Sequence, residues 1–177
     1  DPRKERGPKD LGRFGLGLKT ASFSQCRRLT VVSAVKGHRA GAEWSLARIE
    51  DDDDWFISVL DPSEIAEQPF IETLGETGTL VIWRDLDRLL EEETGQKRDE
   101  IVNEKLVVVE RHLSLVFHRF LAGEVKGRRK LAIRINGHPI AAFDPFCRKN
   151  EATQILREEK VWIGDVPIVM QPYILPH

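Results

Sequence analysis

The sequence has few of the features that mark secreted, membrane or metal-binding proteins. Its two cysteines, Cys26 and Cys147, are too few for a disulfide framework and fit no metal-ligand spacing. Its apolar runs are far shorter than the roughly 20 residues that a membrane-spanning helix needs. No secretory or transit segment is visible. These absences predict a protein in a reducing, cytoplasmic setting with no membrane partner.

An excess of charge of either sign is also missing. Lysine and arginine number 27 against 29 aspartates and glutamates, so the whole chain has no electrostatic preference for nucleic acid. A nucleic-acid partner is therefore not indicated by composition, although it stays open through one local basic cluster. That cluster consists of Lys126, Arg128, Arg129 and Lys130.

Runs rich in β-branched and aromatic residues predict four strands in the first half of the chain. The first two are residues 29–34 and 42–49, with a turn at Gly37 between them, and the others are residues 55–60 and 78–83. A short helix is expected to begin near Pro62, with Ser63 as its N-cap residue. The tryptophans stand in such runs, which predicts core or sheet-face positions rather than a base-stacking platform: Trp44, Trp55, Trp83 and Trp162.

The second half begins with a helical pattern and ends with β patterns. Residues 130–136 alternate as a half-buried strand, and Asn136 and Gly137 predict a tight turn after it. Residues 161–163 and 166–173 predict a hairpin. Between residues 98 and 121, apolar side chains recur in steps of three and four, which predicts one long amphipathic helix. They are Val102, Leu106, Val109, Leu113, Val116 and Phe120.

A glycine-rich motif, GRFGLGLKTA, occupies residues 12–21 and leads into a helix-compatible stretch. The first turn of a helix has unpaired N–H groups and a partial positive charge, which together favour phosphate. The spacing fits neither a Walker A loop nor a dinucleotide-binding fingerprint. The motif therefore predicts a phosphate site with its own geometry. Its members are Gly12, the backbone amides of Gly15, Leu16, Gly17 and Leu18, the charge of Lys19, and the hydroxyls of Thr20 and Ser22.

The same motif resembles the lid-and-helix motif of GHKL ATPases, the class of gyrase, heat-shock chaperones, histidine kinases and MutL, and especially its chaperone, MutL and MORC branches. A second element of that class, a glycine-threonine pair that opens a central strand, is matched by Gly78 and Thr79. In relatives this threonine lies near the adenine. Residues 136–146 also resemble the passage from the ATPase domain into the next domain.

The resemblance implies an α/β two-layer sandwich of Bergerat type, with a mixed, mainly antiparallel sheet and helices on one face. Residues 1–10 would then be the ATP-lid loop and residues 11–146 the C-terminal part of the ATP-binding domain. Residues 147–177 would start a second, transducer-like domain that contains β structure. ATP and Mg²⁺ are the implied cofactors, and a homodimer is the implied assembly of the parent protein.

Relatives carry three further elements before the lid: a glutamate that activates water, an asparagine that holds magnesium and an aspartate-x-glycine motif that reads adenine. None occurs here at the expected place, so no catalytic residue and no metal ligand is predicted in this chain. We therefore expect a fragment of an ATPase, with the magnesium ligand in a preceding part. Two alternatives stay open. One is a non-catalytic interaction module of the same fold, and the other is a DNA-associated factor that uses the basic cluster.

Overall fold

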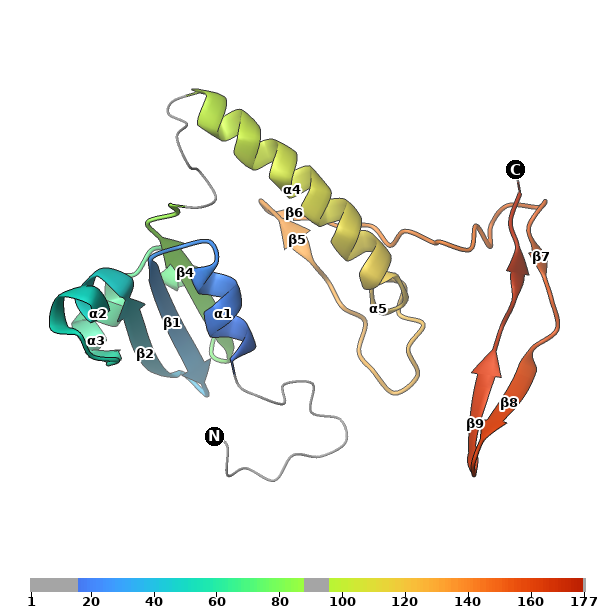
Figure 1. Cartoon of the computed structure of the whole chain (residues 1–177), viewed down its shortest axis with the longest axis horizontal. Coiled ribbons are helices and arrows are strands. Elements are labelled where there is room, and N and C mark those ends of the chain that lie inside the picture. Colours follow the sequence, from blue (N-terminus) through green and yellow to red (C-terminus); the bar gives the residue numbers. More distant parts are fainter. Residues whose placement is uncertain (1–15, 88–95, 177) are drawn as a thin grey trace. The chain divides into compact units, whose positions relative to one another are not determined.

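The computed structural model describes residues 16–87 and 96–176 and divides the chain into two compact units, Asp1–Thr94 and Gly95–His177 (Figure 1). The predicted lid, residues 1–10, lies outside the described residues, as do Gly12 and Gly15. The predicted domain boundary after residue 146 falls within the second unit, and the domain assignment stays a prediction. In the described part of the chain, no helix has the length and apolarity to cross a membrane.

The first unit combines helices with a four-stranded antiparallel sheet in the order β3-β2-β1-β4. The predicted mixture of helices and mainly antiparallel strands is therefore present. The strands are β1 (Arg28–Val35), β2 (His38–Ser45), β3 (Ser58–Leu60) and β4 (Gly78–Arg84). The helices are α1 (Gly17–Phe23), α2 (Leu46–Asp52), α3 (Pro62–Ala66) and the 3₁₀ turn η1 (Ile71–Thr73).

The predicted turn at Gly37 joins β1 to β2 as a tight hairpin. Both central residues, Lys36 and Gly37, have positive φ angles of 51° and 81°, as a type I′ turn requires. This turn sets the register in which Val35 faces His38 and Leu29 faces Trp44. Because partners across an antiparallel pair lie on the same face, this register decides which side chains of β1 meet which helices.

The two faces of the sheet have different coverings. Val32 and Ala34 of β1 lie on one face and form a buried core with Ile65 of α3 and Leu74. The other face carries Leu29, which is fully buried, and lies under α1. Both faces of β1 thus bury apolar side chains, which explains why apolar residues occur at both alternating positions of its sequence.

Three predicted boundaries in the first unit are wrong for local reasons. Residues 46–49 continue as helix α2 rather than as strand, because Ser45 accepts a hydrogen bond from the Arg48 N–H and caps a helix. The N-cap of α3 is Asp61, not Ser63, since Asp61 and Glu64 form a reciprocal capping box. The third strand shrinks to Ser58–Leu60, the stretch that has partners on β2.

The second unit begins with helix α4 (Gln96–Val116), followed by a short helix α5 (His118–Ala122). The single helix predicted here is interrupted at Phe117. The Ser114 carbonyl, which would accept from the His118 N–H in a continuous helix, instead accepts from the Phe143 N–H. The remaining elements are β5 (Arg134–Ile135), β6 (His138–Pro139), β7 (Gln154–Ile155), β8 (Glu159–Ile163), β9 (Val166–Met170) and β10 (Tyr173–Ile174).

The β elements of the second unit are two-stranded pairs, β5-β6, β7-β10 and β8-β9. The predicted turn at Asn136 and Gly137 is confirmed, with φ angles of 49° and 80°. The strand predicted over residues 130–136 keeps only two paired residues, because β6 offers only two partners. The predicted hairpin at Gly164 is also confirmed.

None of the four tryptophans lies in the buried core. Trp44, Trp83 and Trp162 stand on strands as predicted, but 41% of Trp83 and 64% of Trp162 are exposed. Trp55 stands outside any strand and is 68% exposed. Within the described residues, the sheet faces that carry these tryptophans are incompletely covered. A position in a strand-like sequence therefore did not lead to burial of the tryptophan side chain.

Candidate functional site

The candidate site of the first unit is the start of α1. The helix begins at Gly17 with Leu16 as N-cap, and no side chain in the described part of the chain caps it. The N–H groups of the first turn have no acceptor within their own helix. An uncapped helix start therefore leaves the amides of Gly17, Leu18 and Lys19 available to an external acceptor. Of the predicted phosphate amides, the structure describes those from Leu16 onward.

Gly17 is open around its Cα. Among the described residues, a Cβ built at Gly17 would meet no heavy atom within 4 Å, and the φ angle of Gly17 is not in the left-handed region. Neither packing nor backbone conformation thus requires glycine at this position. A surface without a side chain at the start of a helix lets a ligand approach the backbone closely.

Helix α1 is attached to the sheet by a buried hydrogen bond. The Trp83 indole Nε1 donates to the Ser22 Oγ at 2.9 Å, and Ser22 is fully buried. Ser22 was predicted to bind phosphate, and this is wrong, because its hydroxyl faces the sheet. Thr20 donates to the Leu16 carbonyl at 3.0 Å, so its hydroxyl is also used within the helix.

Lys19 lies over an aromatic ring. Its Nζ is 5.7 Å from the centroid of the Trp44 ring, within the range of a cation–π contact. Trp44 belongs to β2 and stands opposite Leu29, on the sheet face that α1 covers. The structure thus places Lys19, the predicted phosphate-binding cation, against the indole of Trp44. Sequence spacing could not predict this contact.

Thr79 is the last of the predicted ATP-site residues in the sequence. It is exposed on β4 and pairs with Ser33 of β1, with the two hydroxyl oxygens 3.4 Å apart. Ser33 lies four residues after Leu29 on the same strand, so Thr79 shares the sheet face that carries α1. Between them, Val31 faces Val81, which is 40% exposed. The face therefore offers an uncovered apolar strip next to α1.

Residues 1–77 match the sequence model of the histidine kinase-, DNA gyrase B- and HSP90-like ATPase family. These residues are therefore similar to part of a GHKL-type ATPase domain. The match confirms the resemblance stated for the glycine motif, and it contains α1 but ends before Thr79. It indicates an ATP-binding function for this GHKL segment, residues 1–77. A search of curated proteins and a search of solved structures gave no significant match.

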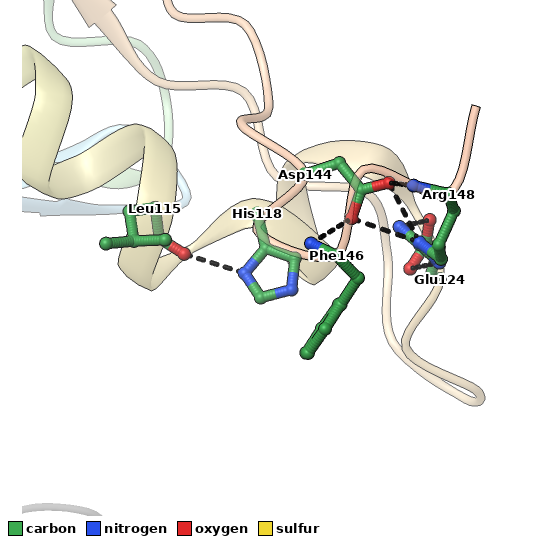
Figure 2. A network of polar contacts seen from close by, with 6 residues as sticks. All are labelled: Leu115, His118, Glu124, Asp144, Phe146 and Arg148. Carbon is green, nitrogen blue, oxygen red and sulfur yellow. Dashed lines mark hydrogen bonds and ion pairs between the residues drawn. The ribbon is translucent and has the colours of Figure 1, made fainter. Parts of the chain in front are cut away.

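The second unit contains a separate polar network, shown in Figure 2. The Arg148 guanidinium donates to both carboxylate oxygens of Glu124 at 2.9 and 3.0 Å, and its Nε donates to Asp144 at 3.0 Å. Asp144 also accepts from the Phe146 and Arg148 backbone N–H groups. The network thereby ties the end of α5 to the turn that follows residue 143.

A cavity of about 700 Å³ adjoins this network. Its wall includes the stacked rings of Phe146 and Tyr173, 4.6 Å apart, and His118, whose Nδ1 donates to the Leu115 carbonyl. One guanidinium is shared by two carboxylates, and every charged group of the network has an ionic partner within it, which is typical of a structural ion-pair cluster. Among the described residues, no group of histidine, cysteine and carboxylate side chains could hold a metal ion.

The network predicts how the stability of the second unit depends on pH. Hydrogen bonds from Arg148 lower the pKa of Glu124. Burial tends to raise the pKa of Asp144, but hydrogen bonds from Arg148 and Phe146 outweigh it and lower the pKa. Because both pKa values are lower in the folded state, the stabilisation is complete above about pH 4 and is lost as pH falls through the folded values.

We therefore expect an Arg148→Gln variant to lose part of this acid sensitivity. Thermal unfolding followed by circular dichroism at pH 7, 5 and 3 measures it. The wild-type midpoint should fall more between pH 5 and 3 than that of Arg148→Gln, which should already be lower at pH 7. Arg128→Gln, an exposed change outside the network, serves as the control. Parallel pH profiles for wild type and Arg148→Gln would contradict the assignment.

Proposed function

We propose that the GHKL segment binds the phosphates of ATP at the start of α1. The amides of Leu16, Gly17 and Leu18 donate to the phosphates together with the preceding Gly12 and Gly15. Lys19 leaves the Trp44 ring and adds its charge. Thr79 lies toward the adenine, on the same sheet face. The support comes from the family match, the uncapped helix start and the shared face.

The finer features of the family belong to the same proposal. These are a Bergerat-type two-layer sandwich, Mg²⁺ held by a part of the parent protein that precedes these residues, and a homodimeric parent. The expectation that all helices lie on one face of the sheet is wrong for the described residues, because α3 packs on the face of Val32 and α1 on the face of Leu29. The parent is of the chaperone-like, MutL-like or MORC-like kind. Residues 147–177 begin its transducer-like domain. The proposal concerns binding, because no general base for hydrolysis is predicted in this chain.

The observation that carries the proposal is Gly17. Glycine is not needed there by the fold, as the free space and ordinary φ angle show. At an uncapped helix start, a glycine that the fold does not need lets a ligand approach the backbone amides; Gly75 has the same free space but does not stand at a helix start. The two explanations predict different effects of a side chain at position 17. A ligand site predicts weaker Mg-ATP binding, whereas a packing role predicts a lower melting temperature.

Replacing Gly17 tests the proposal. We expect Gly17→Val to weaken Mg-ATP binding at least about tenfold, equivalent to about 1.4 kcal/mol, while the melting temperature stays close to that of the wild type. Titration calorimetry and thermal unfolding measure the two effects. Gly75→Val is the matched control, because Gly75 also has free space and an ordinary φ angle. Equal affinity in Gly17→Val and wild type would refute phosphate binding here.

A second candidate function is the interaction module that binds no nucleotide. It is favoured by the contact of Lys19 with Trp44, which occupies the cation in the structure. It predicts no binding heat with Mg-ATP and no change in Trp44 fluorescence. The same titration on the wild-type chain therefore separates the two functions.

A further inference from the structure

The hairpin formed by β8 and β9 exposes an apolar surface. The register pairs Val161 with Ile168 and Ile163 with Val166, around a two-residue turn in which Gly164 has a φ angle of 58°. One face therefore carries five aliphatic or thioether side chains, each at least 41% exposed, with Glu159 at its end opposite Met170. They are Val161, Ile163, Val166, Ile168 and Met170. A two-stranded hairpin is only marginally stable in water on its own. We therefore expect this apolar surface to pack against a partner.

The two outer edges of the hairpin differ in their capacity to accept another strand. Across a two-residue turn, Ile163 and Val166 exchange hydrogen bonds, and pairs then alternate along the hairpin. The backbone groups of Trp162 and Lys160 on β8, and of Pro167 and Val169 on β9, consequently point outward. Proline has no N–H, so the β9 edge lacks a donor. The β8 edge is complete, and no described strand besides β9 pairs with β8.

We propose that the outer edge of β8 pairs antiparallel with β8 of a second copy of this chain. The two hairpins then form one four-stranded sheet around a two-fold axis, with a largely apolar face that also carries Glu159 of each copy. Such an interface uses the same surface on both copies, as a two-fold dimer requires. The surface is separate from the GHKL segment and does not depend on nucleotide.

The charges of β8 select the register of this pairing. Pairing must keep the apolar side chains on one face, so the register can shift only in steps that preserve the alternation. One such register places Lys160 opposite Lys160 of the second copy, and another places Glu159 opposite Glu159 of the second copy. Like charges directly opposite destabilise a sheet. Centring on Val161 avoids both and aligns all five residues of the strand.

The chosen register also gives Lys160 a favourable neighbour. It places the side chain of Lys160 opposite Trp162 of the second copy, where a cation–π contact can form. Trp162 is 64% exposed and available for it. The outward N–H and C=O groups of these two residues hydrogen-bond across the axis, and Val161 faces Val161 of the second copy.

Analytical ultracentrifugation of the chain tests the pairing. We expect a concentration-dependent monomer–dimer equilibrium for the wild type, and a dissociation constant at least tenfold higher for Lys160→Pro, which removes one outward donor. Val169→Pro makes the equivalent change on the β9 edge and should leave the equilibrium unchanged. A monomeric wild type, or an equal effect of the two prolines, would overturn the proposal. A wild-type chain that stays monomeric and binds only an added peptide of another sequence would also overturn the proposal.

Disulfide trapping tests the register without weakening the hairpin. In a Cys147→Ser background, Val161→Cys should form a covalent dimer under mild oxidation. The two Cα atoms would be about 4.5 Å apart in a non-hydrogen-bonded pair, within the range that a disulfide spans. Ile168→Cys, on the same face but on β9, should remain largely uncrosslinked. No crosslink at residue 161, or equal crosslinking of both variants, would refute the register.

Discussion

Leu29→Ala is expected to lower the free energy of unfolding of the first unit by about 3 kcal/mol. Leu29 is fully buried, and it stands between Trp44 and Trp83 in the register of the sheet. Removing its side chain leaves a cavity beneath α1, where Ser22 and the Trp83 indole are also fixed. The loss therefore includes both the transfer of apolar atoms and the loosening of the helix.

Urea denaturation followed by tryptophan fluorescence measures this effect, because Trp83 contacts α1 directly through its hydrogen bond to Ser22. Val59→Ala on β3 is the control, since Val59 is 79% exposed and should change stability by less than about 0.5 kcal/mol. Equal unfolding midpoints for Leu29→Ala and Val59→Ala would show that α1 does not rest on Leu29 as described.

Gly41→Val should destabilise the opposite face of the same sheet by about 2 to 3 kcal/mol. A Cβ at Gly41 would lie 3.0 Å from the Ile65 Cγ1 and 3.1 Å from the Leu60 Cδ1. Valine adds two further methyl groups to this contact. The buried core of Val32, Ala34, Ile65 and Leu74 has no free space for them, so β2 or α3 must shift.

A double variant distinguishes overpacking from a general intolerance of valine. Ile65→Ala removes the atom that the new Cβ would meet, so Gly41→Val should cost less in the Ile65→Ala background than in the wild type. Denaturation midpoints of the four proteins give the coupling energy. Additive losses would contradict the proposed clash and would place the cause of any destabilisation elsewhere on β2.

Local sequence patterns predicted most of the first unit. β1 and β4 follow from stretches rich in β-branched residues. The turn at Gly37, like those at Asn136 and Gly164 in the second unit, follows from residues that tolerate positive φ. The cap at Asp61 was missed because Ser63, a second residue type capable of capping, stands two residues later. Hydrogen-bond geometry, not residue type, decides between them.

The long helix shows a different limit. Its apolar repeat predicted one element across residues 98–121, and the repeat does continue through the break. The interruption at Phe117 arises because the Phe143 N–H takes the Ser114 carbonyl. A periodic pattern within one segment carries no information about a backbone donor from another segment.

The sequence by itself indicated the similarity of residues 1–77 to the GHKL ATPase family, because glycine spacing before a helix restricts the backbone conformation and the ligand to which it is open. Only the tertiary structure decided the roles of Ser22 and Lys19, whose partners Trp83 and Trp44 come from distant strands. Only the strand register showed that β8 has a complete outer edge while Pro167 interrupts that of β9. Contacts between residues far apart in the chain depend on register and packing, which no local pattern encodes.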